Sequence, residues 1–252
     1  IIKALIFKNL ELPGTMIFST SDGQVKQTTI QDLKPGSRYK SRASVVMKLK
    51  DASARMINAE YYEPQAKNVS LTAISKHGYG LRFDVAEVPT QGTRTAGVRA
   101  INLKDDDEMV NLVQTTDDDH LAIMTQRGAF KEMRANELEV GSRARRGVLV
   151  LHKLKKHPHE IVDFLAYPAD YHGAFEVITD RPEFQDILVD DHHLGTAKSN
   201  GTFVIDTDTQ GTPVALRRKI MVMDNPDNES TNDNDQTDSP DHGAQQESLD
   251  IK

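Results

Sequence analysis

Short runs of alternating apolar and polar residues, each leading into a polar turn, occur along most of the chain. Four of them stand out: IFSTSDGQVKQ from Ile17, TAISKHGYGLR from Thr72, AIMTQRGAFKE from Ala122 and EVITDRPEFQD from Glu176. This pattern is typical of two short strands joined by a hairpin, in which a residue such as Gly128 supplies the positive φ that a tight turn needs. The chain therefore predicts many strands and little helix, with one helical turn expected in 135–139.

The hairpins recur with a period of about 50 residues. Their turn residues are 55, 50 and 54 positions apart: Gly23, Gly78, Gly128 and Pro182. A second glycine follows each turn by 13 or 14 residues: Gly36, Gly92, Gly141 and Gly195. Basic residues and an apolar run come next: SVVMKL, VRAINL, VLVLHKL and TFVIDT. A constant offset inside a constant period indicates a repeat architecture.

Each repeat predicts four short strands. In the repeat around Gly128 we expect them at 109–114, 121–125, 129–134 and 148–154, grouped in a single sheet. Four-stranded sheets arranged radially as blades form a propeller, which leaves only short sheet edges exposed. Each blade would bury its apolar face against its neighbours. We predict an all-β fold, a propeller-like β-pinwheel with about four blades.

Charge separates the last part of the chain from the rest. Residues 224–252 contain nine acidic residues and one lysine, a net charge of -8, whereas the whole chain carries -7. Residues 1–223 are therefore left at +1. The acidic segment has too few apolar residues to offset the entropy of ordering. We expect a β-pinwheel domain over 1–223 and a disordered acidic tail over 224–252, which either competes weakly with phosphate for basic residues or only aids solubility.

Composition indicates the cellular compartment in which the protein acts. The chain has no cysteine, which is compatible with a reducing cytosol. No apolar run approaches the roughly 20 residues that a membrane span needs, so we expect a cytoplasmic protein with no membrane partner. The sequence has neither an initiator methionine nor a signal peptide, which indicates a piece of a longer chain.

The second glycine of each repeat opens a loop rich in small and basic residues. We call these segments the glycine loops: 36–42, 92–99, 141–148 and 195–202. Small residues expose backbone N–H groups, and guanidinium groups form forked contacts with phosphate. Repetition would place the loops along one rim, where they would form a positive track for bent DNA. The alternative is that these bases are ordinary surface charges, solvated and without a ligand. The candidate DNA-binding residues are Arg38, Lys40, Arg42, Arg94, Arg99, Arg143, Arg145, Arg146, Lys153, Lys155, Lys156 and Lys198.

Other candidate sites are weaker. The strings KKHPHE at 155–160 and DDHH at 190–193 contain metal-ligand residue types, but no third ligand follows at a recognisable spacing. We expect their histidines to be solvated and predict no metal site. The acidic runs 105–108 and 117–119 are expected to cap turns away from DNA. No nucleophile–base constellation stands out, so we predict no catalytic residues.

Two strings carry a resemblance to a known family: ARRGVLVLHKLKKHPHEIV from Ala144 and SNGTFVIDTDTQGTPV from Ser199. The chain resembles, over roughly residues 10–223, the C-terminal β-pinwheel of bacterial type IIA topoisomerase A subunits. It is most similar to the topoisomerase IV form of Gram-positive bacteria, with gyrase as the alternative. The resemblance implies a domain that binds and bends double-stranded DNA, blades that exchange a strand with their neighbours, and one or two further N-terminal blades.

The resemblance also implies a role within a larger enzyme. The domain would present DNA segments to the strand-passage core for decatenation and relaxation during chromosome segregation. Its partners would be the remainder of the A subunit, which forms a homodimer, and the B subunit, which carries the ATPase. The holoenzyme would be an ATP-dependent isomerase that binds ATP and Mg elsewhere, so no cofactor is expected here. Its catalytic tyrosine follows an arginine in an upstream winged-helix domain; Arg38-Tyr39 matches that dipeptide, but it lies in a glycine loop.

Two alternatives stay open. The gyrase loop of the form Q-R-R-G-G-K-G does not occur in this chain, where TQGTRTAGV comes nearest. Gyrase carries that loop on its first blade, which would precede this chain. The alternative from another class is a propeller that binds proteins. Such a propeller needs an apolar or mixed face in place of an arginine rim, and its binding depends little on salt.

Overall fold

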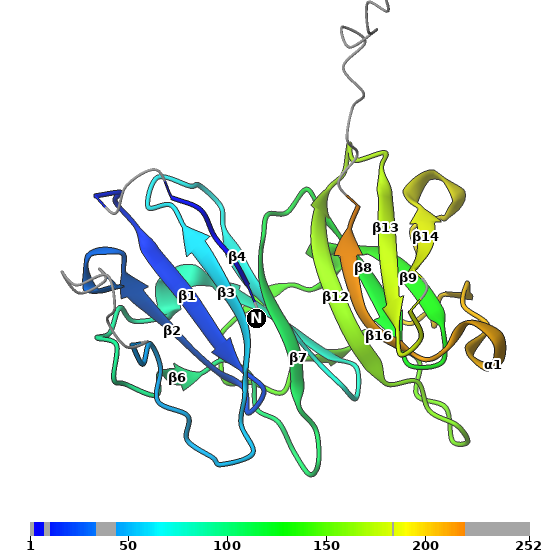
Figure 1. The fold of residues 1–252 in the computed structure, drawn as a ribbon, viewed down its shortest axis with the longest axis horizontal. Coiled ribbons are helices and arrows are strands. Elements are labelled where there is room, and N and C mark those ends of the chain that lie inside the picture. The colour runs from blue at the N-terminus through cyan, green and yellow to red at the C-terminus, as the bar shows by residue number, and fades with distance from the viewer. Residues whose placement is uncertain (1–2, 8–10, 34–43, 183, 220–252) are drawn as a thin grey trace, which may run out of the picture. The chain divides into compact units, whose positions relative to one another are not determined.

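Sixteen short strands form four sheets in the computed structural model, which describes residues 3–7, 11–33, 44–182 and 184–219 (Figure 1). The sheets are arranged as propeller blades, which we call blades A to D in chain order. The predicted all-β fold with about four blades is confirmed. In the described part of the chain, no helix has the length and apolar character to cross a bilayer. The predicted tail at 224–252 lies outside the described residues.

In blades A and B the innermost strand is the one that comes just before the next hairpin in the sequence. Blade A consists of β3 (Met56–Tyr62), β1 (Thr15–Thr20), β2 (Gln24–Thr29) and β6 (Val98–Arg99). Blade B consists of β7 (Met109–Thr115), β4 (Ser70–Ser75) and β5 (Tyr79–Asp84), and β5 pairs further with β10 (Val140–Gly141) and β11 (Val148–Leu149).

Blades C and D repeat this order. Blade C consists of β12 (Ile161–Pro168), β8 (Asp119–Thr125), β9 (Ala129–Arg134) and β15 (Thr202–Phe203). Blade D has three described strands: β16 (Pro213–Arg218), β13 (Ala174–Thr179) and β14 (Phe184–Leu188). The helical elements among the described residues are the 3-10 turns η1 (Gln31–Leu33), η2 (Val85–Glu87), η3 (Ala135–Glu137) and η4 (Val189–Asp191), and the short helix α1 (Thr207–Gln210). The helical turn expected at 135–139 is thus η3.

The hairpins form where the alternating pattern placed them. In blade C the chain turns between β8 and β9, and the Gly128 N–H donates to Thr125 O at 3.0 Å. Gly128 has a φ of +79°, and a Cβ atom there would lie only 2.2 Å from Ile205 O. Glycine is therefore required at position 128 for two reasons. The left-handed backbone disfavours side chains, and a neighbouring segment passes too close to leave room for one.

The grouping of strands within one repeat was wrong. Strand β7 pairs with β4 and β11 pairs with β5, both in blade B, whereas β8 and β9 belong to blade C. Each described glycine loop crosses back to the preceding blade and supplies its outer strand: β6 to blade A, β11 to blade B and β15 to blade C. The strand exchange that the resemblance implied is therefore present. The expected strand at 148–154 is shortened to Val148–Leu149.

Among the described residues, three of the four apolar clusters lie between consecutive blades. Ile17 of blade A packs in one cluster with Leu71 and Phe83 of blade B. A second cluster joins Ile74 of blade B with residues of blade C, and a third joins blade C with Phe175 of blade D. A blade alone would expose one side of each cluster, so its stability depends on its neighbours.

A row of polar side chains ties the inner strands together. Asn58 Nδ2 on β3 donates to Leu112 O at 2.9 Å, and Asn111 Nδ2 on β7 donates to Phe164 O at 3.0 Å. The same place on β12 is held by Asp163, whose Oδ2 accepts from the Leu216 N–H at 3.0 Å. Burial raises the pKa of Asp163 to about 6, although hydrogen bonds from the Leu216 and Phe164 N–H groups and from Asn111 oppose this.

Candidate nucleic-acid interface

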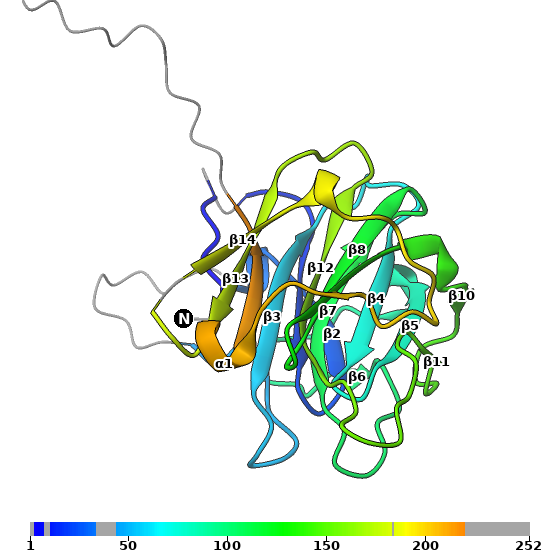
Figure 2. The ribbon, with the colours of Figure 1, turned by 90° about the vertical axis from the view of Figure 1, so that its right-hand side faces the viewer.

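The described glycine loops occupy equivalent places on the outer edges of blades A, B and C. Loop 92–99 ends in β6, which pairs antiparallel with β2. Loop 141–148 contains β10 and leads into β11, both beside β5 (Figure 2). Loop 195–202 leads into β15, which pairs with β9. The sequence repeat has become a spatial repeat along one rim. Loop 36–42, with Arg38, Tyr39, Lys40 and Arg42, lies outside the described residues.

Two of the described loops are hydrogen-bonded to the segment that follows the preceding loop in the sequence. The Lys48 N–H donates to Thr95 O at 3.0 Å, and the Asn102 N–H donates to Arg145 O at 2.8 Å. A second bond at the same junction runs from the Ala144 N–H to Ala100 O at 2.6 Å. Loops 92–99 and 141–148 are therefore each tied through the backbone to the repeat before them.

An acidic side chain holds the start of a loop in two repeats. Glu87 Oε2 accepts from the Arg143 N–H at 3.1 Å, and Glu137 Oε2 accepts from the Ala197 N–H at 2.7 Å. Both acids lie in 3-10 turns, nine residues after their turn glycines. Sequence reasoning missed them, although an acid stands at this offset of nine in all four repeats and could have been found there.

Two lysines lie buried beneath loops. Lys26 is 0% exposed, and its Nζ donates to Gly92 O at 2.7 Å, Thr93 O at 3.1 Å and Thr95 Oγ1 at 3.4 Å. Lys131 is 2% exposed; its Nζ donates to Val150 O, to Ala197 O at 3.1 Å and to Ser199 O at 3.0 Å. Burial lowers the pKa of Lys26, and that of Lys131 to about 8, where Glu137 opposes the change.

The arginines of loop 141–148 differ in their surroundings. Arg143 is half-buried; its Nε donates to Glu87 O at 3.1 Å and its Nη1 to Arg99 O at 3.0 Å. The guanidinium of Arg146 stacks on the Tyr79 ring, 4.1 Å from its centroid. Arg145 is exposed and, among the described residues, its side chain has no hydrogen bond or ion pair. Of the three, Arg145 is thus best placed to reach a ligand.

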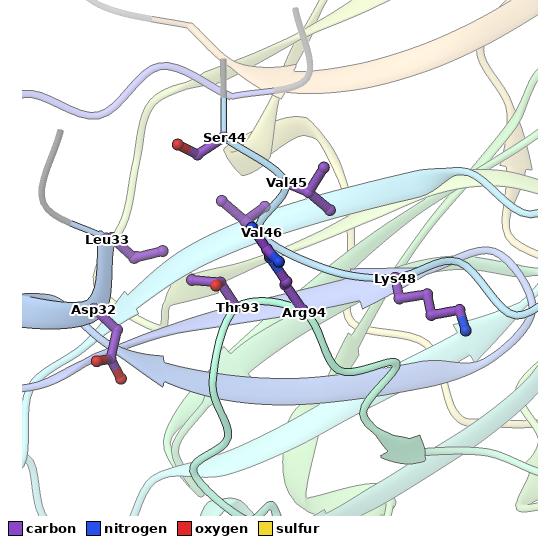
Figure 3. A pocket seen from close by; sticks show the side chains of 8 residues that line it. All are labelled: Asp32, Leu33, Ser44, Val45, Val46, Lys48, Thr93 and Arg94. Carbon is purple, nitrogen blue, oxygen red and sulfur yellow. The ribbon is translucent and has the colours of Figure 1, made fainter. Parts of the chain in front are cut away.

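The remaining described candidates are exposed. Arg94 lines a hollow of about 640 Å³ together with Thr93, with Asp32 and Leu33 of η1 and with 44–46 and Lys48 (Figure 3). The Arg99 Nη1 donates to Asn102 Oδ1 at 3.4 Å. The other exposed bases are Lys153, Lys155, Lys156 and Lys198. The rim is not purely basic, because the outer strands also expose Val148 and Phe203.

The other sequence candidates lie apart from this rim chemistry. Asp107 Oδ1 accepts from the His77 N–H at 2.9 Å and Asp119 Oδ2 accepts from the Thr116 N–H at 2.6 Å, so both acidic runs hold turns as expected. Within the described ranges, no cluster of three His, Cys, Asp or Glu residues could hold a metal. One expectation was wrong: His159 is buried, with Nδ1 3.2 Å from Thr125 Oγ1, and burial lowers its pKa.

Proteins with a similar sequence and fold are known. The chain is similar to the A subunit of DNA topoisomerase 4 from Streptococcus pyogenes (33% identity, 77% of this chain and 25% of the relative) and from Bacillus subtilis (34%, 86% and 26%). It thus spans about a quarter of the length of these relatives. It also resembles the crystal structure of the C-terminal domain of DNA topoisomerase IV, with a TM-score of 0.77 at 31% identity over 86% of this chain and 65% of that one.

A solved DNA gyrase A C-terminal domain shares the fold, with a TM-score of 0.71 at 20% identity over 85% of this chain and 68% of that one. The family model described as the DNA gyrase C-terminal domain, beta-propeller, matches residues 15–57, 70–116 and 119–167, more than half of the chain. These segments contain the hairpins of blades A, B and C together with the glycine loop that follows each of them in the sequence. The chain belongs to the DNA gyrase C-terminal domain family of β-propellers.

Proposed function

We propose that this chain binds and bends double-stranded DNA as a domain of a topoisomerase IV A subunit, with the row of glycine loops as its contact surface. The observation that supports this most is the backbone anchoring of equivalent loops. Loops 92–99 and 141–148 are each hydrogen-bonded to the segment that follows the preceding loop, and they carry the exposed bases Arg94 and Arg145. A row of bases on equivalent loops, fixed by backbone hydrogen bonds, suits the regular spacing of phosphates better than it suits a small ligand.

Bending follows from the same geometry. Loops on successive blades of a propeller do not lie on a straight line, so a duplex that touches several of them must curve. Smooth bending of a 20–30 bp site by 40–90° costs about 1–6 kcal/mol. Several phosphate contacts, each releasing counterions, would offset that cost, and no base needs to be read.

Fluorescence anisotropy with duplexes of unrelated sequence tests the binding. If about five to eight phosphates are contacted, log affinity falls with log salt at a slope of about -0.9 per contact. Energy transfer between dyes on the two duplex ends measures bending. The triple variant R94A/R145A/K198A is expected to lose affinity and salt slope while it stays folded. A flat salt response, or strong preference for one duplex, would contradict the proposal.

A protein-binding propeller is the second candidate, and the exposed Val148 and Phe203 side chains on the outer strands favour it. It differs in its salt response, because apolar contacts are little affected by ionic strength. The same titration therefore separates the two functions.

In the complete protein, this domain would deliver DNA segments to the strand-passage core for decatenation and chromosome segregation in the bacterial cytoplasm. Its partners there would be a second copy of the A subunit, in a homodimer, and the B subunit, which would carry the ATPase. ATP and Mg would act outside this domain. These roles extend the DNA-binding proposal to the three quarters of the relatives' length that this chain does not span.

A further inference from the structure

Two of the three described glycine loops rest on a buried ammonium group, an unusual place for lysine. A lysine is almost never fully buried unless its charge is satisfied. Lys26 and Lys131 stand at the same position in their repeats, three residues after Gly23 and Gly128. Each is satisfied by three oxygen acceptors rather than by a carboxylate. Such a donor set fixes a backbone conformation more than it balances a charge.

The acceptors flank an exposed base in both loops. Lys26 holds Thr93 O and Thr95 Oγ1, and the residue between them is Arg94. Lys131 holds Ala197 O and Ser199 O, and the residue between them is Lys198. Both intervening side chains are exposed, whereas the atoms on either side of them are anchored inward.

Blade B shows the same result reached by other means. Its residue at the lysine position is Leu81, and the space beneath loop 141–148 is a cavity of about 510 Å³. Here the neighbours of the exposed Arg145 are fixed by the Ala144 N–H bond to Ala100 O and by the stacking of Arg146 on Tyr79. Each of the three loops thus holds an exposed base between two anchored neighbours, by one of two different devices.

We propose that Lys26 and Lys131 are positioning residues for DNA binding, each of which anchors the backbone on both sides of one exposed base, Arg94 or Lys198, and so fixes that base at the rim. The inference rests on the proposed DNA binding and names the residues that prepare its contact surface. Preorganised contacts lose less conformational entropy on binding than mobile ones. Lys131 also joins two blades, because its third acceptor, Val150 O, follows the outer strand of blade B.

A double-mutant cycle with K131M and K198A tests this. The loss of one phosphate contact weakens binding about eightfold at 0.1 M salt, since affinity scales with salt to the power of about -0.9 per contact. If Lys131 acts by placing Lys198, K131M and K198A each cost about that factor, and the double variant binds no more weakly than either one. The matched control is R134M, which removes one exposed charge from the end of the same strand. It should bind within about twofold of wild type, and its effect should be additive with that of K198A.

A pH titration gives a second readout. At pH 7 the Lys131 ammonium donates three hydrogen bonds; the neutral amine, formed as pH rises through about 8, can donate only two. Glu137 in η3 is the charged group that acts on its pKa. The ionisable neighbours along β9 are Glu132 and Arg134, and Lys198 lies between the two loop acceptors. Wild-type affinity should fall between pH 7 and pH 9 toward that of K131M, while K198A and K131M change little.

The outcomes separate the two proposals. If the wild type does not bind DNA, the proposed function fails. If it binds, but K131M and K198A are additive or K131M binds like the wild type, the positioning role is wrong. Should K131M fail to fold, as judged by circular dichroism, the pH titration of wild type against K198A decides, because parallel profiles would overturn the inference.

Discussion

Folding stability should fall as the carboxyl group of Asp163 ionises. The pKa of this buried group is raised from 3.8 to about 6 in the folded chain. An acid whose pKa is higher in the folded state contributes stability that is fully present below the unfolded pKa and lost as pH rises through the folded value. The difference of about two pKa units corresponds to about 3 kcal/mol, since one unit is 1.36 kcal/mol. About 2 kcal/mol of it lies between pH 4.5 and pH 7.5.

Urea unfolding of wild type and D163N across this range measures the effect. Asparagine has nearly the same shape and cannot ionise, so D163N should show a flatter dependence on pH. Its amide group faces the Leu216 N–H, which adds a cost of about 1–3 kcal/mol for an unsatisfied donor. That cost does not vary with pH, so it displaces the D163N curve without changing its slope.

The free energy of unfolding of wild type minus that of D163N should therefore decrease by about 2 kcal/mol from pH 4.5 to pH 7.5. Circular dichroism is a suitable signal, because the chain has no tryptophan. Other carboxylates titrate in both proteins and cancel in the difference. A difference that stays constant within about 0.5 kcal/mol would show that the Asp163 carboxyl group is not held near pKa 6.

Three further predictions concern the rim and the hairpins. R145A should weaken DNA binding in anisotropy titrations without changing the melting temperature, whereas R143A should also cost about 1–3 kcal/mol of stability, because it removes bonds to Glu87 O and Arg99 O; equal melting temperatures for the two variants would contradict this. G128A should lower the free energy of unfolding by more than about 1 kcal/mol, because a Cβ atom would meet Ile205 O on a left-handed backbone; an unchanged urea midpoint would refute that reasoning. Truncation after Met223 should tighten DNA binding at about 50 mM salt and matter less near 300 mM, where screening is stronger; equal affinities at low salt would leave the tail with a solubilising role.

Local features of the fold could be predicted from the sequence. The hairpins around Gly23, Gly78 and Gly128 follow from alternation and turn chemistry, which act over a few residues. The period and the positions of the glycine loops follow from the repeat. Blade membership could not be predicted in this way, because β7 and β11 reach blade B through pairings with β4 and β5 that are distant in the sequence.

The site was only partly predictable for a similar reason. Basic residues in loops suggest exposure, and Arg94, Arg145 and Lys198 are exposed. The same rule fails for Arg143, which reaches backbone oxygens that only the fold brings near. A related rule, that a charged residue in an alternating strand faces solvent, fails for Lys26 and Lys131. Only three acceptors from other segments make their burial possible.

The lending of outer strands between neighbours has a consequence for a cleaved chain. A single cut between β9 and β11 would divide the protein into two polypeptides. The first would carry β5 and the second β11, yet these two strands would remain paired in blade B. The two fragments would stay associated through sheet hydrogen bonds and through the packing of Val150 and Leu151. A protein built in this way can survive nicking in its loops and still move as one body on a native gel, while a denaturing gel shows two bands.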